Sequence, residues 1–339
     1  MRSTSPNALR RALLALAMAA GSAVALPASA AETELLNVSY DVARELYKDV
    51  NPAFIAAYKA QSGQAVTIKQ SHGGSSKQAR AVADGLEASV VTMNQANDID
   101  MLADRGLVAK DWARKFPNNA APYYSTMVFL VRKGNPKQVR DWQDLARQGV
   151  QVVIPNPKTA GNGRYTYLAA WGSVIKKGGN DIQARELVGK IFKNVPILDG
   201  GGRAATTTFT QRQIGDVLVT FENEVSMVRA EFGDNFEVVY PATSILAESP
   251  VAVVDKVVDR RKLRQPATAY LNYLYSPAGQ EFGAKHFMRV RNETVMKKYA
   301  ANYKPISLFT VDEVFGGWRA AQKRHFDDGG EFDKIYQAK

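Results

Sequence analysis

Residues 66–76 read V-T-I-K-Q-S-H-G-G-S-S, an apolar strand-like run that ends in a glycine turn and opens onto a helix-forming stretch. The same order recurs in residues 150–164, V-Q-V-V-I-P-N-P-K-T-A-G-N-G-R, and in residues 195–203, V-P-I-L-D-G-G-G-R. A helix N-terminus presents unpaired backbone N–H groups and the positive end of the helix dipole. Each turn is therefore a candidate binding site for an anion. Three such turns that converge would bind an oxyanion without a catalytic group.

The first thirty residues have the composition of an export signal. They combine a positive region with Arg2, Arg10 and Arg11, an apolar run over 12–26, and the small-residue cleavage site Ala28-Ser29-Ala30. An uncleaved membrane anchor is the alternative, but Gly21, Ser22 and Pro27 interrupt the run well short of the roughly 18–20 residues that a membrane span needs. The adjacent arginines alone do not indicate the twin-arginine route, so we expect general secretion and cleavage after residue 30.

The composition argues against several kinds of site. The chain of 339 residues has no cysteine, so disulfides, thiolate zinc sites and cysteine nucleophiles are excluded. Its three histidines are far apart, and neither an H-E-x-x-H nor a G-x-S-x-G motif is present. The acidic segment 327–333 lacks the ligand spacing of a calcium loop. We therefore expect no metal, no cofactor and no enzymatic activity.

The charge is positive but spread along the chain. The full sequence carries a formal net charge of +11, and loss of the three arginines in the export signal would leave about +8. Such a surface attracts anions, whereas nucleic-acid binding is the rival interpretation. No basic run is interleaved with aromatic residues, and the densest cluster, residues 259–264, is explained by a solvated helix start. We expect no nucleic-acid partner.

Strand-like and helix-like segments alternate along the chain, which predicts an α/β fold. Strands are expected at 35–39, 90–92, 216–221 and 236–240, and helices at 43–61 and from Ser75 or Ser76 through 86. The extended run 123–132 is expected to cross from one lobe to another, and 246–254, which contains Pro250, to return. This organisation predicts lobe 1 at 31–122 and 255–339, and lobe 2 at 123–254. The segment from about residue 258 is expected to pack back on lobe 1.

Several segments together resemble the periplasmic sulfate- and thiosulfate-binding proteins of ABC importers. They occur in order over nearly the whole mature chain, and include K-A-Q-S-G-Q at 59–64, Q-S-H-G-G-S at 70–75, F-L-V-R-K-G-N-P-K at 129–137, N-P-K-T at 156–159 and F-G-G-W at 315–318. The resemblance implies a two-lobed type II periplasmic solute-binding protein fold with crossover hinge strands. It further implies a monomeric periplasmic protein that closes on sulfate or thiosulfate and delivers it to a membrane permease.

Within that family the chain looks closer to the thiosulfate-binding branch. The sulfate-binding members are expected to carry a tryptophan where Phe221 stands, and Phe221 has no N–H group to donate. Ala160 stands where the family motif N-P-K-[S/T]-S-G has serine, so a hydroxyl donor is absent there as well. The preference between the two anions stays open at this point, as do binding of another tetrahedral oxyanion such as phosphate or molybdate, a role as an anion sensor, and an enzyme built on the same fold.

The candidate ligand-binding residues are drawn from the three turns and two further segments. They are Gly74, Ser75, Ser76, Asn94, Gln95, Thr159, Ala160, Gly161, Asn162, Gly202, Arg203, Ala204 and Phe221. The turns around Ser75 and Gly161 contain hydrogen-bond donors and no carboxylate. This donor set suits a fully ionised dianion with acceptors only, whereas hydrogen phosphate carries a proton that requires an acceptor.

Overall fold

The computed structural model of the protein describes residues 33–337, so the predicted export signal at 1–30 lies outside the described residues. Within residues 33–337, no helix is both long and apolar enough to cross a membrane. Residues 34–337 belong to one compact unit. The predicted lobe boundaries are untested and stay a prediction.

The first turn is built on a four-stranded sheet. Its strand order is β12-β3-β1-β2, with bounds Val251–Val253, Val90–Thr92, Thr33–Tyr40 and Val66–Gly73. β1 and β3 are parallel, whereas β12 runs antiparallel to β3. The strands predicted at 35–39 and 90–92 are confirmed. The sheet shares one core with Phe54 of α2 (Arg44–Ser62), Leu102 of α4 (Ala96–Asp104) and Leu271 of α11 (Arg264–Tyr273).

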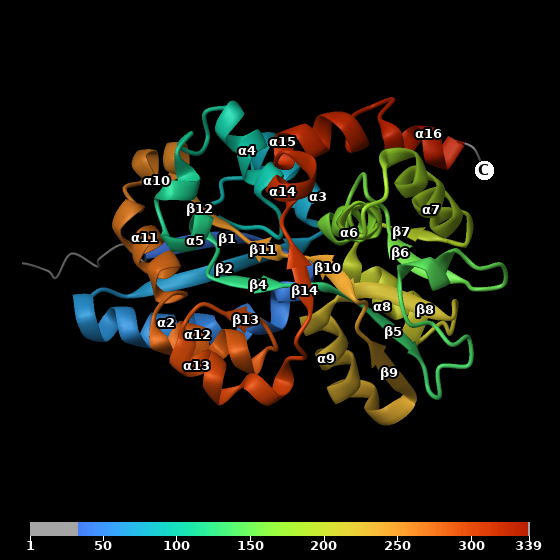
Figure 1. Ribbon diagram of the computed structural model, residues 1–339. Helices are drawn as coiled ribbons and strands as arrows, with labels where there is room; N and C mark the ends of the chain where they lie inside the picture. The colour runs from blue at the N-terminus through green and yellow to red at the C-terminus, as the bar shows by residue number, and fades with distance from the viewer. Residues whose placement is uncertain (1–32, 338–339) are drawn as a thin grey trace, which may run out of the picture. The chain divides into compact units, whose positions relative to one another are not determined.

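The second and third turns belong to a five-stranded sheet. Its order is β7-β6-β8-β5-β9, with bounds Leu198–Asp199, Val152–Pro155, Val217–Phe221, Met127–Arg132 and Phe236–Val239. Successive residues of β5 point to opposite faces, so Phe129 and Leu130 enter two different cores. α6 (Gly161–Lys176) and α7 (Asp181–Lys193) cover one face, while α8 (Gly202–Thr210) and α9 (Glu222–Phe232) cover the other (Figure 1). The strands predicted at 216–221 and 236–240 are confirmed.

The predicted crossing strand over 123–132 is two strands rather than one. β4 (Tyr123–Ser125) lies in a three-stranded antiparallel sheet with β11 (Ala247–Ser249) and β13 (Arg289–Val290), whereas β5 belongs to the five-stranded sheet. Thr126 separates them, and its hydroxyl donates to the Ile245 carbonyl at 2.9 Å. The predicted return segment divides in the same way, because Pro250 falls between β11 and β12. Both segments therefore run from one sheet to another.

A buried ion pair joins the three-stranded sheet to the start of α9. Arg289 on β13 donates from Nε and Nη2 to the two carboxylate oxygens of Glu222, at 2.6 and 2.9 Å. Arg289 also donates to the Lys304 carbonyl at 2.7 Å. Both side chains are almost fully buried, so each charge is compensated by the other and by backbone.

The C-terminal segment packs differently from the expectation. β14 (Ser307–Phe309) pairs in parallel with β10 (Thr243–Ile245). Phe309, Phe326 and Phe332 join the core formed by α6, α7 and the five-stranded sheet, not the core around β1. The expectation that everything beyond residue 258 packs on lobe 1 is therefore wrong for this segment, because its aromatic side chains are buried among residues of the predicted lobe 2.

The remaining helices connect and cover these sheets. Their bounds are α3 Ser75–Ala83, α5 Pro117–Ala120, α10 Asp255–Arg261, α12 Pro277–Lys285, α13 Glu293–Lys298, α14 Val311–Phe315, α15 Trp318–Ala321 and α16 Glu331–Gln337. Short 3-10 turns lie at Asp41–Ala43, Trp112–Arg114, Trp142–Ala146, Gly233–Asn235 and Ala300–Asn302, and a π-turn lies at Gln322–Phe326. α3 ends earlier than predicted, because Gly85 adopts a positive φ of 116°.

Candidate anion-binding site

Each of the three glycine turns opens onto a helix, as the sequence predicts. α3 begins at Ser75, α6 at Gly161 and α8 at Gly202. The residues before them are Gly74, Ala160 and Gly201, and none supplies a side-chain cap to its helix. Since the first amides of a helix have no intrahelical acceptor, these N-termini retain donors for another partner.

The three turns meet at Gly74. A Cβ atom built on Gly74 would lie 2.9 Å from the Thr159 carbonyl oxygen and 3.1 Å from that of Gly200. A Cβ atom on Gly201 would lie 3.9 Å from the Gly74 Cα atom. Only a residue without a side chain allows this approach, so Gly74 brings the first turn against the second and third.

Asn94 and Gln95 follow β3 and extend the meeting point. A Cβ atom on Gly161 would lie 1.9 Å from Asn94 Oδ1, and that buried oxygen has no hydrogen-bond partner. Gln95 donates from Nε2 to the Ser76 hydroxyl at 2.9 Å, while its own Oε1 has no partner. Rotation of the Asn94 amide by half a turn would present Nδ2 in place of Oδ1, so this side chain can offer either a donor or an acceptor beside Gly161.

Asn162 connects the second turn to the third. Its Nδ2 donates to the Thr220 hydroxyl at 2.9 Å and lies 3.3 Å from the position of a Cβ atom on Gly202. The Thr159 hydroxyl donates to the Gly200 carbonyl at 3.2 Å. Ala160 is buried, whereas Ala204 is exposed on the first turn of α8. Both side chains are methyl groups, so only their backbone can contribute hydrogen bonds.

The Ser75 hydroxyl is already engaged within the protein. It donates to Asp98 Oδ2 at 2.5 Å, and Asp98 Oδ1 lies 3.8 Å from Nη1 of Arg164. Arg164 also donates from Nε to the Pro157 carbonyl at 2.9 Å. The expectation of donors without carboxylates around Ser75 is therefore wrong, because α4 brings a buried aspartate to the start of α3. These contacts link the first turn to the loop before α6.

The third turn contains Asp199, whose Oδ1 accepts the Thr208 hydroxyl at 3.1 Å and whose buried Oδ2 has no partner. Two further carboxylates, from the turn after β1 and from α9, lie beside it. Asp41 Oδ2 accepts the Arg203 N–H at 3.2 Å, and burial raises the pKa of Asp41, opposed by its hydrogen bonds to the Arg203 and Val42 amides. Glu224 accepts the hydroxyls of Thr206 and Thr220, both at 2.5 Å. Burial raises the pKa of Glu224 as well. Both acids are held by donors of the protein.

Sequence reasoning did not place Asp41, Asp98 or Glu224 at the anion site, although it found Glu224 at a strand end. Asp41 directly follows β1, and Glu224 lies three residues after β8. Ligands of open α/β sheets collect at the carboxyl ends of strands. Polar residues directly after each predicted strand were therefore the signal that could have found Asp41 and Glu224.

Phe221 ends β8 beside these carboxylates, but its ring is packed. The ring meets that of Tyr165 on α6 edge to face at 5.8 Å between centroids, and Tyr165 in turn meets Trp318 at 5.0 Å. Phe221 thus forms an apolar wall that is supported from behind by two aromatic residues.

The comparison with protein families gives the class of protein. The described residues contain no group of three His, Asp or Glu side chains that could hold a metal ion. The family model of bacterial extracellular solute-binding proteins matches residues 39–289, and the chain belongs to that family. The family is extracytoplasmic, and the similar proteins described next are named as binding proteins rather than enzymes.

Particular members of this family are close to the chain. It is 59% identical over 330 residues to a thiosulfate-binding protein of Pseudomonas aeruginosa, covering 97% of this chain and 99% of that protein. It is 54% identical over 308 residues to a sulfate-binding protein of Salmonella typhimurium, covering 90% of this chain and 94% of that protein. The solved structure of the sulfate-binding protein SubI from Mycobacterium tuberculosis matches with a TM-score of 0.79 and 32% identity, covering 87% of this chain and all of that chain. These matches confirm the predicted solute-binding fold.

Proposed function

We propose that this protein captures thiosulfate or sulfate at the meeting point of α3, α6 and α8 and delivers it to the permease of an ABC importer. One observation carries the proposal: Gly74, Gly161 and Gly202 bring three uncapped helix N-termini together. Each N-terminus adds backbone donors and a positive dipole end, which suits one small dianion. The names of the similar proteins support the same ligands.

The carboxylates at the site bear on whether it prefers sulfate and thiosulfate or hydrogen phosphate. The two oxygens of Asp41 accept the Val42 and Arg203 amides, at 3.0 and 3.2 Å, and Glu224 accepts two threonine hydroxyls. These acceptors are engaged with protein donors and are not available to the proton of hydrogen phosphate. The site favours an anion that brings acceptors only when the Asn94 amide is turned to present Nδ2, because Oδ1 in its present position is a buried acceptor without a partner.

The backbone supplies the principal contacts in this proposal. We assign the anion to the N–H groups of Ser75, Ser76, Gly161, Asn162 and Ala204, with the amide of Asn94 or Gln95 as a side-chain donor and Phe221 as an apolar wall. The Arg203 N–H is already bonded to Asp41 and can join them only if that bond is released. Thr159, Ala160 and Gly202 shape the turns. The Ser75 hydroxyl orients Asp98 rather than contacting the anion. Backbone donors are fixed before binding, so little conformational freedom is lost when the ligand arrives.

The cellular compartment of the mature protein is inferred from the N-terminal sequence. A cleaved signal at residues 1–30 would place the mature chain in the periplasm as a monomer that docks to its permease. Amino-terminal sequencing of protein recovered from the periplasm tests this part, and a chain that begins at Ala31 is expected. A chain that keeps Met1 and sediments with membranes would instead indicate an anchor.

Calorimetric titration of the purified mature protein tests the ligand. We expect thiosulfate and sulfate each to bind one to one, and phosphate to give no saturable heat at the same concentrations. Molybdate serves as the second tetrahedral dianion without a proton. Saturable binding of phosphate alone would overturn the donor-only argument, and binding of molybdate alone would change the ligand but keep the geometry.

A further inference from the structure

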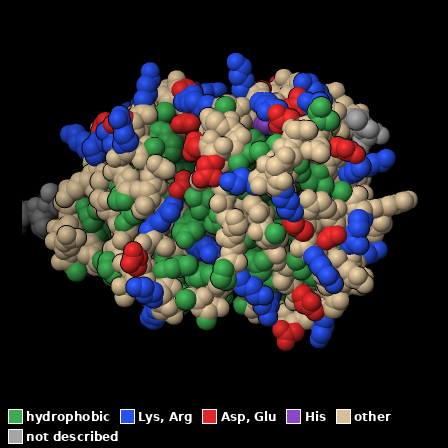
Figure 2. Space-filling view, viewed as in Figure 1, with side chains coloured by type: hydrophobic (Ala, Val, Ile, Leu, Met, Phe, Trp, Pro, Cys, Tyr) green, Lys and Arg blue, Asp and Glu red, His purple; other side chains and the backbone are tan. Residues whose placement is uncertain are grey.

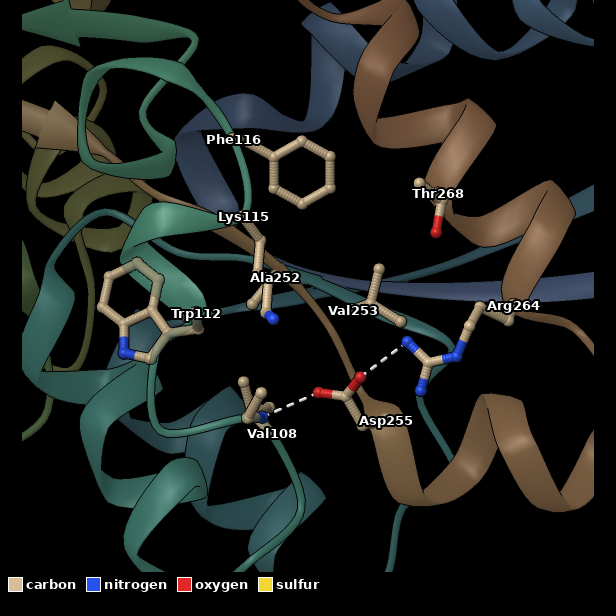
Figure 3. Close-up of a pocket in the computed structure, with 10 residues that line it drawn as sticks. Val108, Trp112, Lys115, Phe116, Ala252, Val253, Asp255, Arg264 and Thr268 are labelled. Carbon is tan, nitrogen blue, oxygen red and sulfur yellow. Dashed lines mark hydrogen bonds and ion pairs between the residues drawn. The ribbon is translucent and has the colours of Figure 1, made fainter.

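A cavity lies away from the three turns. It has a volume of about 400 Å³ and is enclosed by the loop and 3-10 turn before α5, by β12 and by α11. Figure 3 shows the rings of Trp112 and Phe116 among the lining residues, with Arg264 and Thr268 opposite them and the Val253 side chain between. None of its lining residues belongs to the anion-binding turns. Its volume falls within the range of small-molecule sites.

The walls of this cavity combine apolar side chains with polar groups. Val108, Trp112, Phe116, Ala252 and Val253 all line it and are otherwise buried in the core around β1. The ring of Phe116 stacks on that of Tyr275 at 6.1 Å with an interplanar angle of 4°, which fixes its orientation. A surface of fixed aromatic and aliphatic side chains suits the apolar body of a ligand.

Polar groups on the same cavity retain unused donors. Arg264 donates to Asp255 and Asp259 through three of its five N–H groups. Asp255 is satisfied, because its second oxygen accepts the Ala109 amide at 2.7 Å. Lys115 forms one ion pair, with Asp111 at 2.9 Å. The Thr268 hydroxyl has no hydrogen-bond partner among the described residues. The unused groups are donors, whereas the carboxylate is occupied.

The surroundings of the cavity are basic. Segments 110–115 and 255–264 together carry eight lysine and arginine residues and three aspartates. Figure 2 shows lysine and arginine side chains on the upper left of the molecule, where Figure 1 places α10 and α11. A cavity that combines apolar side chains with donors at a positive surface suits anions that also carry an apolar body.

We propose that this cavity binds a small amphipathic monoanion, with an aromatic or branched aliphatic body against Trp112 and Phe116 and a carboxylate or sulfonate near Lys115, Arg264 and Thr268. An inorganic dianion does not suit it, because Lys115 and Arg264 are already paired with aspartates and the apolar side chains cannot replace the hydrogen bonds that such an ion loses on leaving water. The cavity is thus a second site that differs from the first in ligand chemistry.

Fluorescence titration of the mature protein with anilinonaphthalene sulfonate tests the proposal. We expect a saturable increase with one probe molecule bound per chain, unchanged by saturating thiosulfate. Lys115→Gln is expected to weaken probe binding about fivefold through loss of the ammonium group. Lys110→Gln removes the same charge from a neighbouring position that does not line the cavity, and is expected to have a much smaller effect.

A cavity-filling variant provides a second test that does not depend on charge. Thr268→Phe is expected to abolish probe binding while thiosulfate binding is retained, and Thr268→Val is the matched variant that keeps the cavity open. Displacement of the probe by thiosulfate would assign it to the turns and overturn the proposal. Equal affinities for Lys115→Gln and Lys110→Gln, or unchanged binding to Thr268→Phe, would overturn it as well.

Discussion

The anion-binding turns and the Glu222–Arg289 ion pair are both buried and polar, but they compensate charge in different ways. The turns combine helix N-terminal donors with the carboxylates Asp41, Asp98 and Glu224, which protein donors hold. Two side-chain oxygens there, Asn94 Oδ1 and Gln95 Oε1, have no partner. The ion pair consists of two opposite charges held by two hydrogen bonds at 2.6 and 2.9 Å. The turns keep polar atoms that are free to bond with a ligand. In the ion pair, the Arg289 and Glu222 atoms that form the two hydrogen bonds are already used.

This difference separates binding from structural stability. A region whose helix N-termini keep N–H groups without an intrahelical acceptor can bind an external ion through those groups. The Glu222–Arg289 pair stabilises the contact between the three-stranded sheet and the start of α9. Removal of one partner would leave the other charge buried and lower the stability of the protein. Substitutions in the turns should therefore act mainly on affinity, and substitutions in the ion pair mainly on stability.

The largest effect is expected from Arg289→Met. Glu222 would remain buried without its counter-charge, and loss of one partner of a buried pair costs about 3–5 kcal/mol. Urea denaturation should report this decrease in the free energy of unfolding. The double variant Glu222→Leu/Arg289→Met should recover much of the loss, because it also removes the uncompensated charge.

Arg260→Met is the matched control for this prediction. Arg260 and Glu87 are also 2.6 Å apart, but both side chains are more than half exposed. Pairs of this kind contribute about 0–1 kcal/mol. An Arg289→Met variant that is no less stable than Arg260→Met would show that burial of the pair does not matter, and would remove the contrast between the two regions.

The next effect is expected from Gly74→Ala. The new Cβ atom would overlap the Thr159 carbonyl oxygen at 2.9 Å, so the first turn would have to move away from the second. We expect thiosulfate affinity to fall at least tenfold, which corresponds to about 1.4 kcal/mol, with a smaller change in melting temperature. Gly200→Ala is the control, because a Cβ atom there meets nothing within 4 Å. Equal affinity of the two variants would mean that the close approach at Gly74 is not needed for binding.

Ser75→Ala should have a smaller effect, divided between stability and affinity. The variant removes the donor to Asp98 Oδ2 and leaves a buried carboxylate short of one hydrogen bond, at a cost of about 1–2 kcal/mol. We expect the affinity for thiosulfate to fall less than tenfold, since the backbone N–H remains. Ser244→Ala removes a hydroxyl from a neutral carbonyl acceptor and should cost less. A larger loss of affinity with unchanged stability would place the hydroxyl on the anion.

The smallest effect concerns the choice between the two anions. Ala160→Ser adds a hydroxyl beside α6, and Phe221→Trp adds an indole N–H at the apolar wall. Each new bond should favour sulfate over thiosulfate by about 1 kcal/mol, measured as the ratio of the two dissociation constants. Tyr165→Phe is the control, because it changes the residue behind Phe221 without adding a donor. An unchanged ratio in the double variant would place both side chains outside contact with the anion.

The sequence predicts the turns well because their signal is local. Glycine next to a strand on one side and a helix-forming stretch on the other indicates where α3, α6 and α8 begin, and these starts are found within a residue or two. The resemblance to anion-binding proteins adds which turns belong together. Which residues contact the anion is not tested by the structure and stays a prediction.

The carboxylates could not be predicted in the same way, because distant parts of the chain bring them to the turns. Asp41 is 162 residues from its partner Arg203, and Asp98 is 23 residues from Ser75. The break at Thr126 is equally non-local, since its hydroxyl meets the Ile245 carbonyl 119 residues away. Local pattern shows that a strand exists there, but not to which sheet each half belongs.

The late strand β14 also bears on how the chain folds. It pairs in parallel with β10, more than sixty residues earlier, and Phe309, Phe326 and Phe332 complete a core whose other members begin at Met127. Pairing between distant segments must wait until both are present, and this slows folding. A chain that emerges from its N-terminus first can form the sheet around β1 to a large extent, but it leaves the second core open until its last thirty residues have arrived. The intermediate would expose aromatic surface, so this part of the molecule is where premature collapse or aggregation should begin.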